Sequence, residues 1–140
     1  MIPKEVFLSH SSENHLVATS VSETIRNHGV PIWYSPTNII ASQPWLEEIG
    51  RALRRCDWFM ILLSGPAIDS IWVKRELFYA LSHNQYNDRI MPVIIEPCNY
   101  EELAWPLGSF QIVDFTIDQD IAYTQILRAR GLGFDRSLMR

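Results

Sequence analysis

A tryptophan and a glutamate lie one helical turn apart in the segment SIWVKRELFYAL, residues 70–81. At about 100° per residue, the apolar side chains of this segment share one stripe of a predicted helix, and Trp72 and Glu76 follow along its flank. The stripe is formed by Val73, Leu77, Ala80 and Leu81. Glu76 is therefore predicted to lie at the rim of the buried face, where a carboxylate is half desolvated beside an aromatic ring and suited to catalysis. The alternative is a solvated flank residue, the commoner place for a single glutamate on an amphipathic helix.

Short apolar runs alternate with amphipathic segments along the chain, which is the pattern of a parallel sheet wrapped by helices. The predicted strands are residues 6–9, 31–34, 57–64, 90–95 and 110–115. The longest run, DWFMILLS, shows no polar alternation and is predicted to be the central strand, buried on both faces. One predicted helix ends at His28, before Gly29, and another closes the chain at 121–130. A third begins at Pro44 and is predicted to bury Trp45, Leu46, Ile49, Leu53 and Cys56.

This alternation predicts an α/β fold with a flavodoxin-like, doubly wound sheet of five parallel strands in the order 2-1-3-4-5 and helices on both faces. Ligands of such sheets bind beyond the carboxyl ends of the strands where the strand order reverses, here between the first and third strands. The polar turn after the first strand offers hydroxyls and backbone N–H groups to a phosphate or a ribose, through Ser9, His10, Ser11 and Ser12. These side chains are equally suited to cap a helix, since no glycine-rich phosphate-binding fingerprint accompanies them.

Composition limits the functional classes. The 140 residues suit a single domain, 1–140, with a core over about 5–131 and a loose tail at 132–140. The formal net charge of −4 gives no reason to expect nucleic acid as the main partner. Cys56 and Cys98 lack metal-ligand spacing and the four histidines are scattered, so no bound metal is predicted.

The sequence predicts a cytoplasmic protein with no membrane partner. The N-terminus lacks a basic region followed by an apolar run, and no stretch approaches the ~18 apolar residues of a membrane span. Each of the two cysteines lies at the edge of an apolar run, and both are expected to be reduced structural thiols.

Five segments, in order between Val6 and about Phe115, resemble the Toll/interleukin-1 receptor (TIR) domain family, especially its bacterial, NAD+-cleaving members. They are FLSHSSEN, HGVPIWY, WLEEI, ILLSGPAIDSIWVKREL and MPVI. The most specific part is the LS turn that ends the third strand, followed by S-x-W-x-x-x-E, here Ser70, Trp72 and Glu76. In enzymatic TIR domains this glutamate is the catalytic residue for NAD+ cleavage. The resemblance therefore implies that role for Glu76, with NAD+ as the substrate and no further cofactor.

The resemblance also implies a set of substrate-binding and self-association residues. The substrate-binding set is Ser9, His10, Ser11, Ser12, Tyr34, Trp45, Ser70 and Trp72, with Trp45 at an aromatic position that faces the nucleotide. Residues 34–44 correspond to the family's BB loop, in which Asn38, Ile39, Ile40, Ser42 and Pro44 are assigned to head-to-tail association with other TIR domains. Many members have glycine where this chain has Ser42, a departure that affects the loop conformation. The apolar Ile39 and Ile40 are unusual in a loop, since loops normally run over the surface.

Cleavage of the bond between nicotinamide and ribose suits a site with one carboxylate. The leaving pyridine departs from a cation as a neutral molecule, so no general acid is required, unlike in ordinary glycosidases with their paired carboxylates. Glu76 as an anion can stabilise the developing oxocarbenium charge, while Trp72 or Trp45 supplies a stacking surface. Trp58 and Trp33 are predicted to be structural.

Two function classes therefore remain. The first is an NAD+ nucleosidase or cyclase that makes nicotinamide and ADP-ribose or a cyclic isomer, acting in immune or antiphage-type signalling. The second is a non-catalytic TIR module that acts by homotypic assembly. A receiver or flavin protein is disfavoured, because the first and third strands end in serines and not in the acidic cluster that Mg²⁺ requires.

Overall fold

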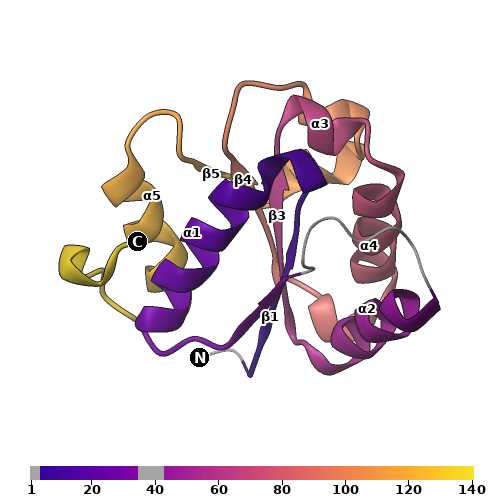
Figure 1. Cartoon of the computed structure of the whole chain (residues 1–140). Coiled ribbons are helices and arrows are strands. Elements are labelled where there is room, and N and C mark those ends of the chain that lie inside the picture. The colour runs from indigo at the N-terminus through magenta and orange to yellow at the C-terminus, as the bar shows by residue number, and fades with distance from the viewer. Residues whose placement is uncertain (1–3, 35–42) are drawn as a thin grey trace.

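Five parallel strands form one sheet at the centre of the molecule (Figure 1). The computed structural model describes residues 4–34 and 43–140, without the side chains of Gln43 and Pro44. The strands are β1 (Val6–Ser9), β2 (Ile32–Tyr34), β3 (Trp58–Leu63), β4 (Ile90–Ile94) and β5 (Val113–Asp114). Their order is β2-β1-β3-β4-β5, and every neighbouring pair is parallel. The predicted flavodoxin-like sheet is therefore confirmed.

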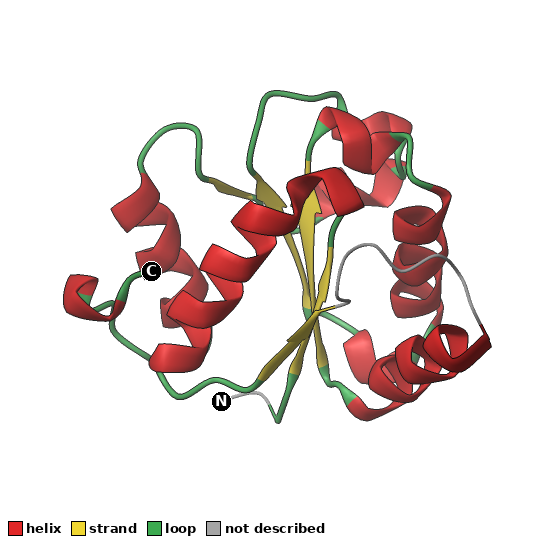
Figure 2. Ribbon diagram, viewed as in Figure 1, coloured by secondary structure: helices red, strands yellow, loops and turns green. Residues whose placement is uncertain are grey.

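Helices cover both faces of the sheet, as Figure 2 shows. One face carries α1 (His15–Asn27) and α5 (Gln119–Arg128), and the other carries α2 (Gln43–Arg55), α3 (Gly65–Ile68) and α4 (Ile71–Ser82). Four short 3-10 turns lie between the larger elements of the described chain: η1 (Ser12–Asn14), η2 (Asn84–Tyr86), η3 (Tyr100–Glu102) and η4 (Trp105–Ser109). A further one, η5 (Arg136–Leu138), follows α5. No helix in the described part of the chain is long and apolar enough to cross a bilayer.

The alternation of side chains along β1 sorts residues between two hydrophobic cores. Val6 and Leu8 belong to the core beneath α1 and α5, whereas Phe7 belongs to the core on the α4 side. Successive side chains of a strand point to opposite faces, so Ser9 shares the face of Phe7. The last residue of β1 is thereby directed toward α4.

The central strand is buried almost throughout, as its apolar run predicts. Phe59 to Leu63 have no exposed surface, because helices cover both faces of this strand. β3 pairs with β1 on one side and with β4 on the other. The fifth strand is shorter than predicted: only Val113 and Asp114 of the 110–115 run pair with β4.

The helices begin and end close to the predicted residues, but two of their buried faces differ from the sequence pattern. α1 is followed by His28 and then by Gly29, whose φ of +88° suits a glycine at the C′ position. In α2 the buried side chains include Ala52 and Leu53, whereas Leu46 is 43% exposed, so its predicted burial is wrong. α4 buries Val73, Leu77 and Ala80 as predicted, and it also buries Glu76.

The last nine residues were expected to form a loose tail, and this expectation is wrong. The backbone N–H of Asp135 donates to His28 Nε2 at 3.0 Å, and that of Arg140 donates to Thr24 Oγ1 at 2.9 Å. The ring of Phe134 stacks on His28 and on Tyr123. Apolar side chains of this segment, including Leu132 and Met139, pack against the core beneath α1 and α5. Their burial offsets the loss of conformational freedom that a free tail would keep.

Candidate active site

The candidate site lies at the edge of the sheet where the chain leaves β1 and β3. These two strands are neighbours, and their successors in the chain, α1 and α3, start from this same edge (Figure 2). α1 then runs down one face of the sheet and α3 leads to α4 on the other. This is the point of strand-order reversal at which doubly wound folds bind ligands.

Glu76 is the buried acidic group of this edge. Its side chain is 6% exposed, and the hydroxyl of Ser9 donates to Oε1 at 2.6 Å across 67 positions of sequence. Glu76 was predicted to be half desolvated at the rim of the buried face. It is more deeply buried than that, because the end of β1 covers it. No other hydrogen bond to its carboxylate is found within the described part of the chain, so the remaining lone pairs are available to a ligand.

Burial changes the acidity of Glu76. Removal of the carboxylate from water raises its pKa from 4.5 to about 7, and the hydrogen bond from Ser9 acts in the opposite direction. Among the described residues no Lys, Arg or His nitrogen lies within ion-pair distance of this carboxylate. Both protonation states of Glu76 are thus populated near neutral pH, which is unusual for a glutamate and typical of functional sites.

A second set of hydrogen bonds ties the neighbouring loops together. The hydroxyl of Ser64 donates to Asn14 Oδ1 at 2.7 Å, which joins the end of β3 to the start of α1. The backbone N–H of Gly65 donates to Glu96 Oε1 at 2.9 Å, which joins the start of α3 to the end of β4. Asn14 and Glu96 were not among the predicted site residues. The signal that could have found them is their position, because each follows the carboxyl end of a strand or the turn after it.

Two of the predicted substrate-binding serines cap helical turns. Ser70 precedes α4, and its hydroxyl accepts from the N–H of Val73 at 3.2 Å. Ser11 is buried and precedes η1, where its hydroxyl accepts from the N–H of Glu13 at 3.3 Å. Ser12 is exposed. Of the two interpretations left open for Ser11, the helix cap is the one with a contact in the structure.

His10 and Tyr34 lie on the other face of the sheet from Glu76. The Tyr34 ring packs against the core beneath α1, and its hydroxyl lies 3.4 Å from Thr19 Oγ1. The rings of His10 and Tyr34 are 6.0 Å apart between centroids, and His10 Nδ1 lies 2.8 Å from the carbonyl oxygen of Ser11. The structure therefore brings His10 and Tyr34 together but separates Tyr34 from Glu76.

The tryptophans divide between the site face and the cores. Trp72 is half-buried one turn before Glu76 on α4, and the guanidinium of Arg75 lies 5.0 Å from the centroid of its ring. Trp45, also half-buried, is in the first turn of α2, which packs beside α4. Trp33 packs on Phe7 with ring centroids 5.1 Å apart, in agreement with its predicted structural role.

The predicted self-association loop is largely beyond what the structure describes. Asn38, Ile39, Ile40 and Ser42 lie outside the described residues, and Pro44 is the second residue of α2. Within residues 4–34 and 43–140, no group of three His, Cys, Asp or Glu side chains is placed to hold a metal ion. The chemistry that the described residues offer is therefore that of one buried carboxylate with a hydroxyl partner.

Comparison with known proteins agrees with this architecture. A family model described as "TIR domain" matches residues 6–127. The crystal structure of the TIR domain of the Toll-related receptor TRR-2 from Hydra magnipapillata is similar in fold, with a TM-score of 0.71. The match covers 90% of this chain and 97% of that one at 16% sequence identity. No curated protein matches the chain at a significant level.

Proposed function

This chain belongs to the TIR domain family, and we propose that it is an NAD+ nucleosidase or cyclase in which Glu76 is the catalytic residue. One observation carries the proposal: the carboxylate of Glu76 is buried at the carboxyl edge of the strands, where the described residues give it a single hydroxyl partner and no cation. Burial of a carboxylate without a countercharge lowers stability. A module that acts only by association has no physical need for such a group, whereas an enzyme that must stabilise a cation does.

The proposed reaction breaks the bond between C1′ of ribose and the nitrogen of nicotinamide. The electron pair of this bond goes to the pyridine ring, which leaves as a neutral molecule, and positive charge develops on the ribose as an oxocarbenium ion. The Glu76 anion stabilises that charge and accepts hydrogen bonds from the ribose hydroxyls. Attack of water then gives ADP-ribose and one proton, and attack of a nucleophile within the substrate gives a cyclic isomer instead.

Ser9 has a positioning role in this proposal. Its hydroxyl holds Oε1 of Glu76 at 2.6 Å, which fixes the carboxylate and leaves its other oxygen to the substrate. The same hydrogen bond favours the anion, since it lowers the pKa of Glu76 against the effect of burial. Trp72, on the same helix, supplies a flat apolar surface close to the reacting group.

The test is incubation of the purified chain with NAD+ and separation of nicotinamide, ADP-ribose and cyclic products by chromatography. Glu76→Gln keeps the shape of the side chain and removes its charge, and we expect it to lower turnover by roughly 100-fold or more. Glu23→Gln, at an exposed position of α1, is the matched control and should retain full turnover.

The outcomes separate the two function classes. NAD+ cleavage that depends on Glu76 supports the enzyme. A folded wild-type chain that releases no nicotinamide at any concentration, while it still associates with itself, supports the interaction module. An active Glu76→Gln variant would exclude Glu76 as the catalytic group.

We further propose that activity depends on head-to-tail association through residues 38–44. The sequence supports this proposal, because Ile39 and Ile40 are apolar residues in a segment whose other residues are typical of a turn. If association completes the site, specific activity rises with protein concentration by mass action. The paired change of Ile39 and Ile40 to Asp should lower activity and leave the monomer folded. Specific activity that stays constant over a roughly hundredfold dilution contradicts this dependence.

A further inference from the structure

The flank of α4 that carries Glu76 changes from buried to exposed across three side chains. Glu76 is 6% exposed, Trp72 is half-buried and Arg75 is exposed. At about 100° per residue, these side chains lie at increasing angles from the buried stripe of Val73 and Leu77, with Arg75 opposite to it. A ligand that contacts Glu76 and extends outward along this flank therefore meets Trp72 and then Arg75.

The guanidinium of Arg75 is held over an aromatic ring and has no acidic partner. Its Cζ lies 5.0 Å from the centroid of the Trp72 ring, a cation–π contact. Among the described residues it makes no ion pair and no hydrogen bond. Burial and the hydrogen bond from Ser9 are the two causes of the shifted pKa of Glu76, so the charge of Arg75 is not directed at that carboxylate. Its N–H donors remain available to a ligand.

The charges around this edge favour an anion on the outer side of α4. Glu13 in η1 and Asp69 between α3 and α4 are both exposed, and their carboxylates repel a phosphate from the top of the sheet. Lys74 is the other cation of α4, but it lies about 160° from Glu76 around the helix axis. Arg75 is therefore the cation of α4 that a ligand of Glu76 reaches.

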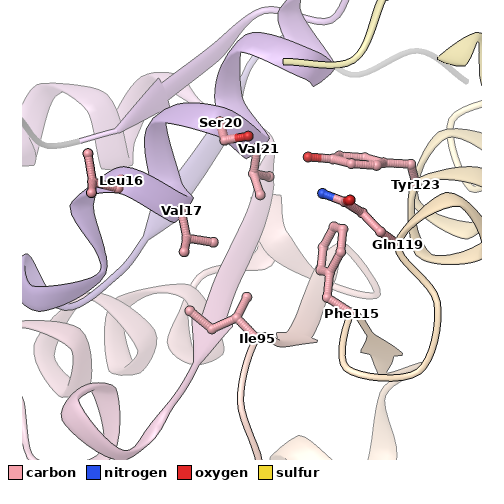
Figure 3. A pocket seen from close by; sticks show the side chains of 8 residues that line it. All are labelled: Leu16, Val17, Ser20, Val21, Ile95, Phe115, Gln119 and Tyr123. Carbon is pink, nitrogen blue, oxygen red and sulfur yellow. The ribbon is translucent and has the colours of Figure 1, made fainter.

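The cavity between α1 and α5, on the opposite face of the sheet, does not suit an anion (Figure 3). The eight side chains that line it include no Lys, Arg or His. A phosphate in this cavity would be desolvated without a countercharge. The outer flank of α4 offers a phosphate both a cation and access to water.

The chemistry of a dinucleotide matches this order of side chains. In NAD+ the ribose that carries nicotinamide at C1′ is joined through C5′ to a pyrophosphate with two negative charges. With C1′ beside the buried carboxylate, the pyrophosphate extends toward solvent. A guanidinium is planar and donates two parallel hydrogen bonds to phosphate oxygens, which an ammonium group does not.

We propose that Arg75, held by the ring of Trp72, binds the pyrophosphate of the substrate and makes the site selective for a dinucleotide over phosphate-free nicotinamide riboside. The role of Arg75 rests on the function proposed above, in which the ribose contacts Glu76. Arg75 binds a part of the substrate that does not react, so its effect is on affinity and on KM. The contact with Trp72 orders the long side chain before the ligand arrives, which lowers the entropic cost of binding.

The first test is a calorimetric titration with ADP-ribose, which carries the pyrophosphate and is not cleaved. Arg75→Gln should raise the Kd of ADP-ribose by about tenfold. Arg75→Lys keeps the charge without the planar fork and should raise the Kd by about threefold. Lys74→Gln is the matched control, since it removes one cation from the other flank of the same helix, and it should change the Kd by less than about twofold.

The second test compares substrates with and without phosphate. In Arg75→Gln the ratio of kcat/KM for NAD+ to kcat/KM for nicotinamide riboside should fall by about tenfold, mainly through the KM for NAD+. A purely structural role would change both substrates alike. Raising the salt concentration from about 50 mM to about 500 mM should weaken ADP-ribose binding to the wild type more than to Arg75→Gln, because the phosphate contact is exposed.

Equal Kd values of ADP-ribose for the wild type and Arg75→Gln would overturn the proposal, and retained NAD+ cleavage would then leave the proposed function in place. An equal loss in Lys74→Gln, or an equal loss with nicotinamide riboside, would also overturn it. A wild type that neither binds ADP-ribose nor cleaves NAD+, at concentrations at which it associates, would overturn both. If Arg75→Gln does not fold, Arg75→Lys and the wild type decide, since wild-type binding that is insensitive to salt excludes an exposed contact between Arg75 and phosphate.

Discussion

Glu76 and Arg130 are two ionisable side chains buried on opposite faces of one sheet, and neither has an ion-pair partner among the described residues. Glu76 lies at the carboxyl edge of the strands with one neutral hydroxyl as its partner. Arg130 lies near the start of β3, over the ring of Trp58 at 4.4 Å from the centroid. Both groups are buried, but they are placed at different edges of the sheet.

The surroundings of Arg130 are those of a structural contact. Its Nη1 donates to the carbonyl of Ile126 at 2.9 Å, in the last turn of α5, where the helix dipole favours a cation. Burial lowers the pKa of its guanidinium to about 10, so the group stays charged at neutral pH. Nε and Nη2 have no hydrogen-bond partner within the described part of the chain. Arg130 therefore fastens α5 to the strand edge that is remote from the candidate site.

The different surroundings of Arg130 and Glu76 distinguish a structural buried charge from a functional one. A charge held by a helix terminus and an aromatic face, away from the ligand-binding edge, points to stability. A charge with free lone pairs at the point of strand-order reversal points to function. Variants at the two positions should therefore change different measured quantities.

The largest expected effect on stability comes from Arg130→Ala. This change leaves a cavity and an uncovered Trp58 ring, and it should lower the free energy of unfolding by about 2–4 kcal/mol, measured by urea denaturation. Arg130→Met fills the same space without a charge and should stay within about 1 kcal/mol of the wild type or exceed it. Both variants should keep the wild-type rate of NAD+ turnover per folded molecule. A loss of turnover in a folded Arg130→Met variant would contradict the structural role of Arg130.

Glu76→Gln is expected to stabilise the protein at neutral and alkaline pH. The folded state holds the proton of Glu76 up to about pH 7, whereas the unfolded chain releases it near pH 4.5. The wild type therefore loses stability as pH rises from 4.5 through 7, since the folded state then binds more protons than the unfolded chain. At about pH 8 the variant should be more stable by about 3 kcal/mol, and near pH 4.5 the two should be similar.

Urea denaturation at several pH values measures this gain, with Glu23→Gln as the control for an exposed glutamate. A gain that is the same at every pH would show that ionisation of Glu76 is not its cause. A loss of stability at about pH 8 would show that the anion is well accommodated in the folded protein.

A smaller contrast is expected between two tryptophans. Trp58 was predicted to be fully buried, but the structure leaves it half-buried against the Arg130 guanidinium. Trp58→Ala should therefore cost about 2 kcal/mol of unfolding free energy, below the range for a fully buried ring. A double-mutant cycle with Arg130→Met should give a coupling of about 1 kcal/mol.

Trp72→Ala should cost less than about 1 kcal/mol of stability, because the ring is half-buried on the outer flank of α4, and it should change KM or the product ratio instead. Equal losses of stability at Trp58 and Trp72, with unchanged kinetics for Trp72→Ala, would contradict the assignment of Trp72 to the site.

The smallest effect is expected from Ser9→Ala. The hydroxyl of Ser9 lowers the pKa of Glu76, so its removal should raise that pKa further. If the anion is the active form, the pH at which kcat/KM reaches half its maximum moves upward by less than about one unit. The measurement is a pH–rate profile of both proteins. A shift toward lower pH would exclude the positioning role of Ser9.

Much of the fold follows from local patterns in the sequence. The uninterrupted apolar run at 57–64 predicts a central buried strand, and β3 occupies Trp58–Leu63. The apolar spacing in 70–81 predicts the helix that the structure places at Ile71–Ser82. Gly29 ends the first helix as expected. These features depend on backbone geometry and on the spacing of neighbouring residues, which the sequence contains directly.

The environment of each site residue was decided by the tertiary structure. The helical period gives the angle of Glu76 about its own axis but not the coverage by Ser9, which lies 67 positions earlier. It also does not give the face on which Tyr34 packs, because that depends on how the end of β2 pairs with β1.

The same holds for Arg130 and for the segment after α5. Residues 132–140 were predicted to form a loose tail because of their place at a terminus, yet the ring of Phe134 stacks on the rings of His28 and Tyr123. Sequence alone specifies which side chains are able to be buried. Which of them are buried, and how their pKa values change, depends on contacts between residues far apart in the chain. Those contacts exist only once the helices have packed against the sheet.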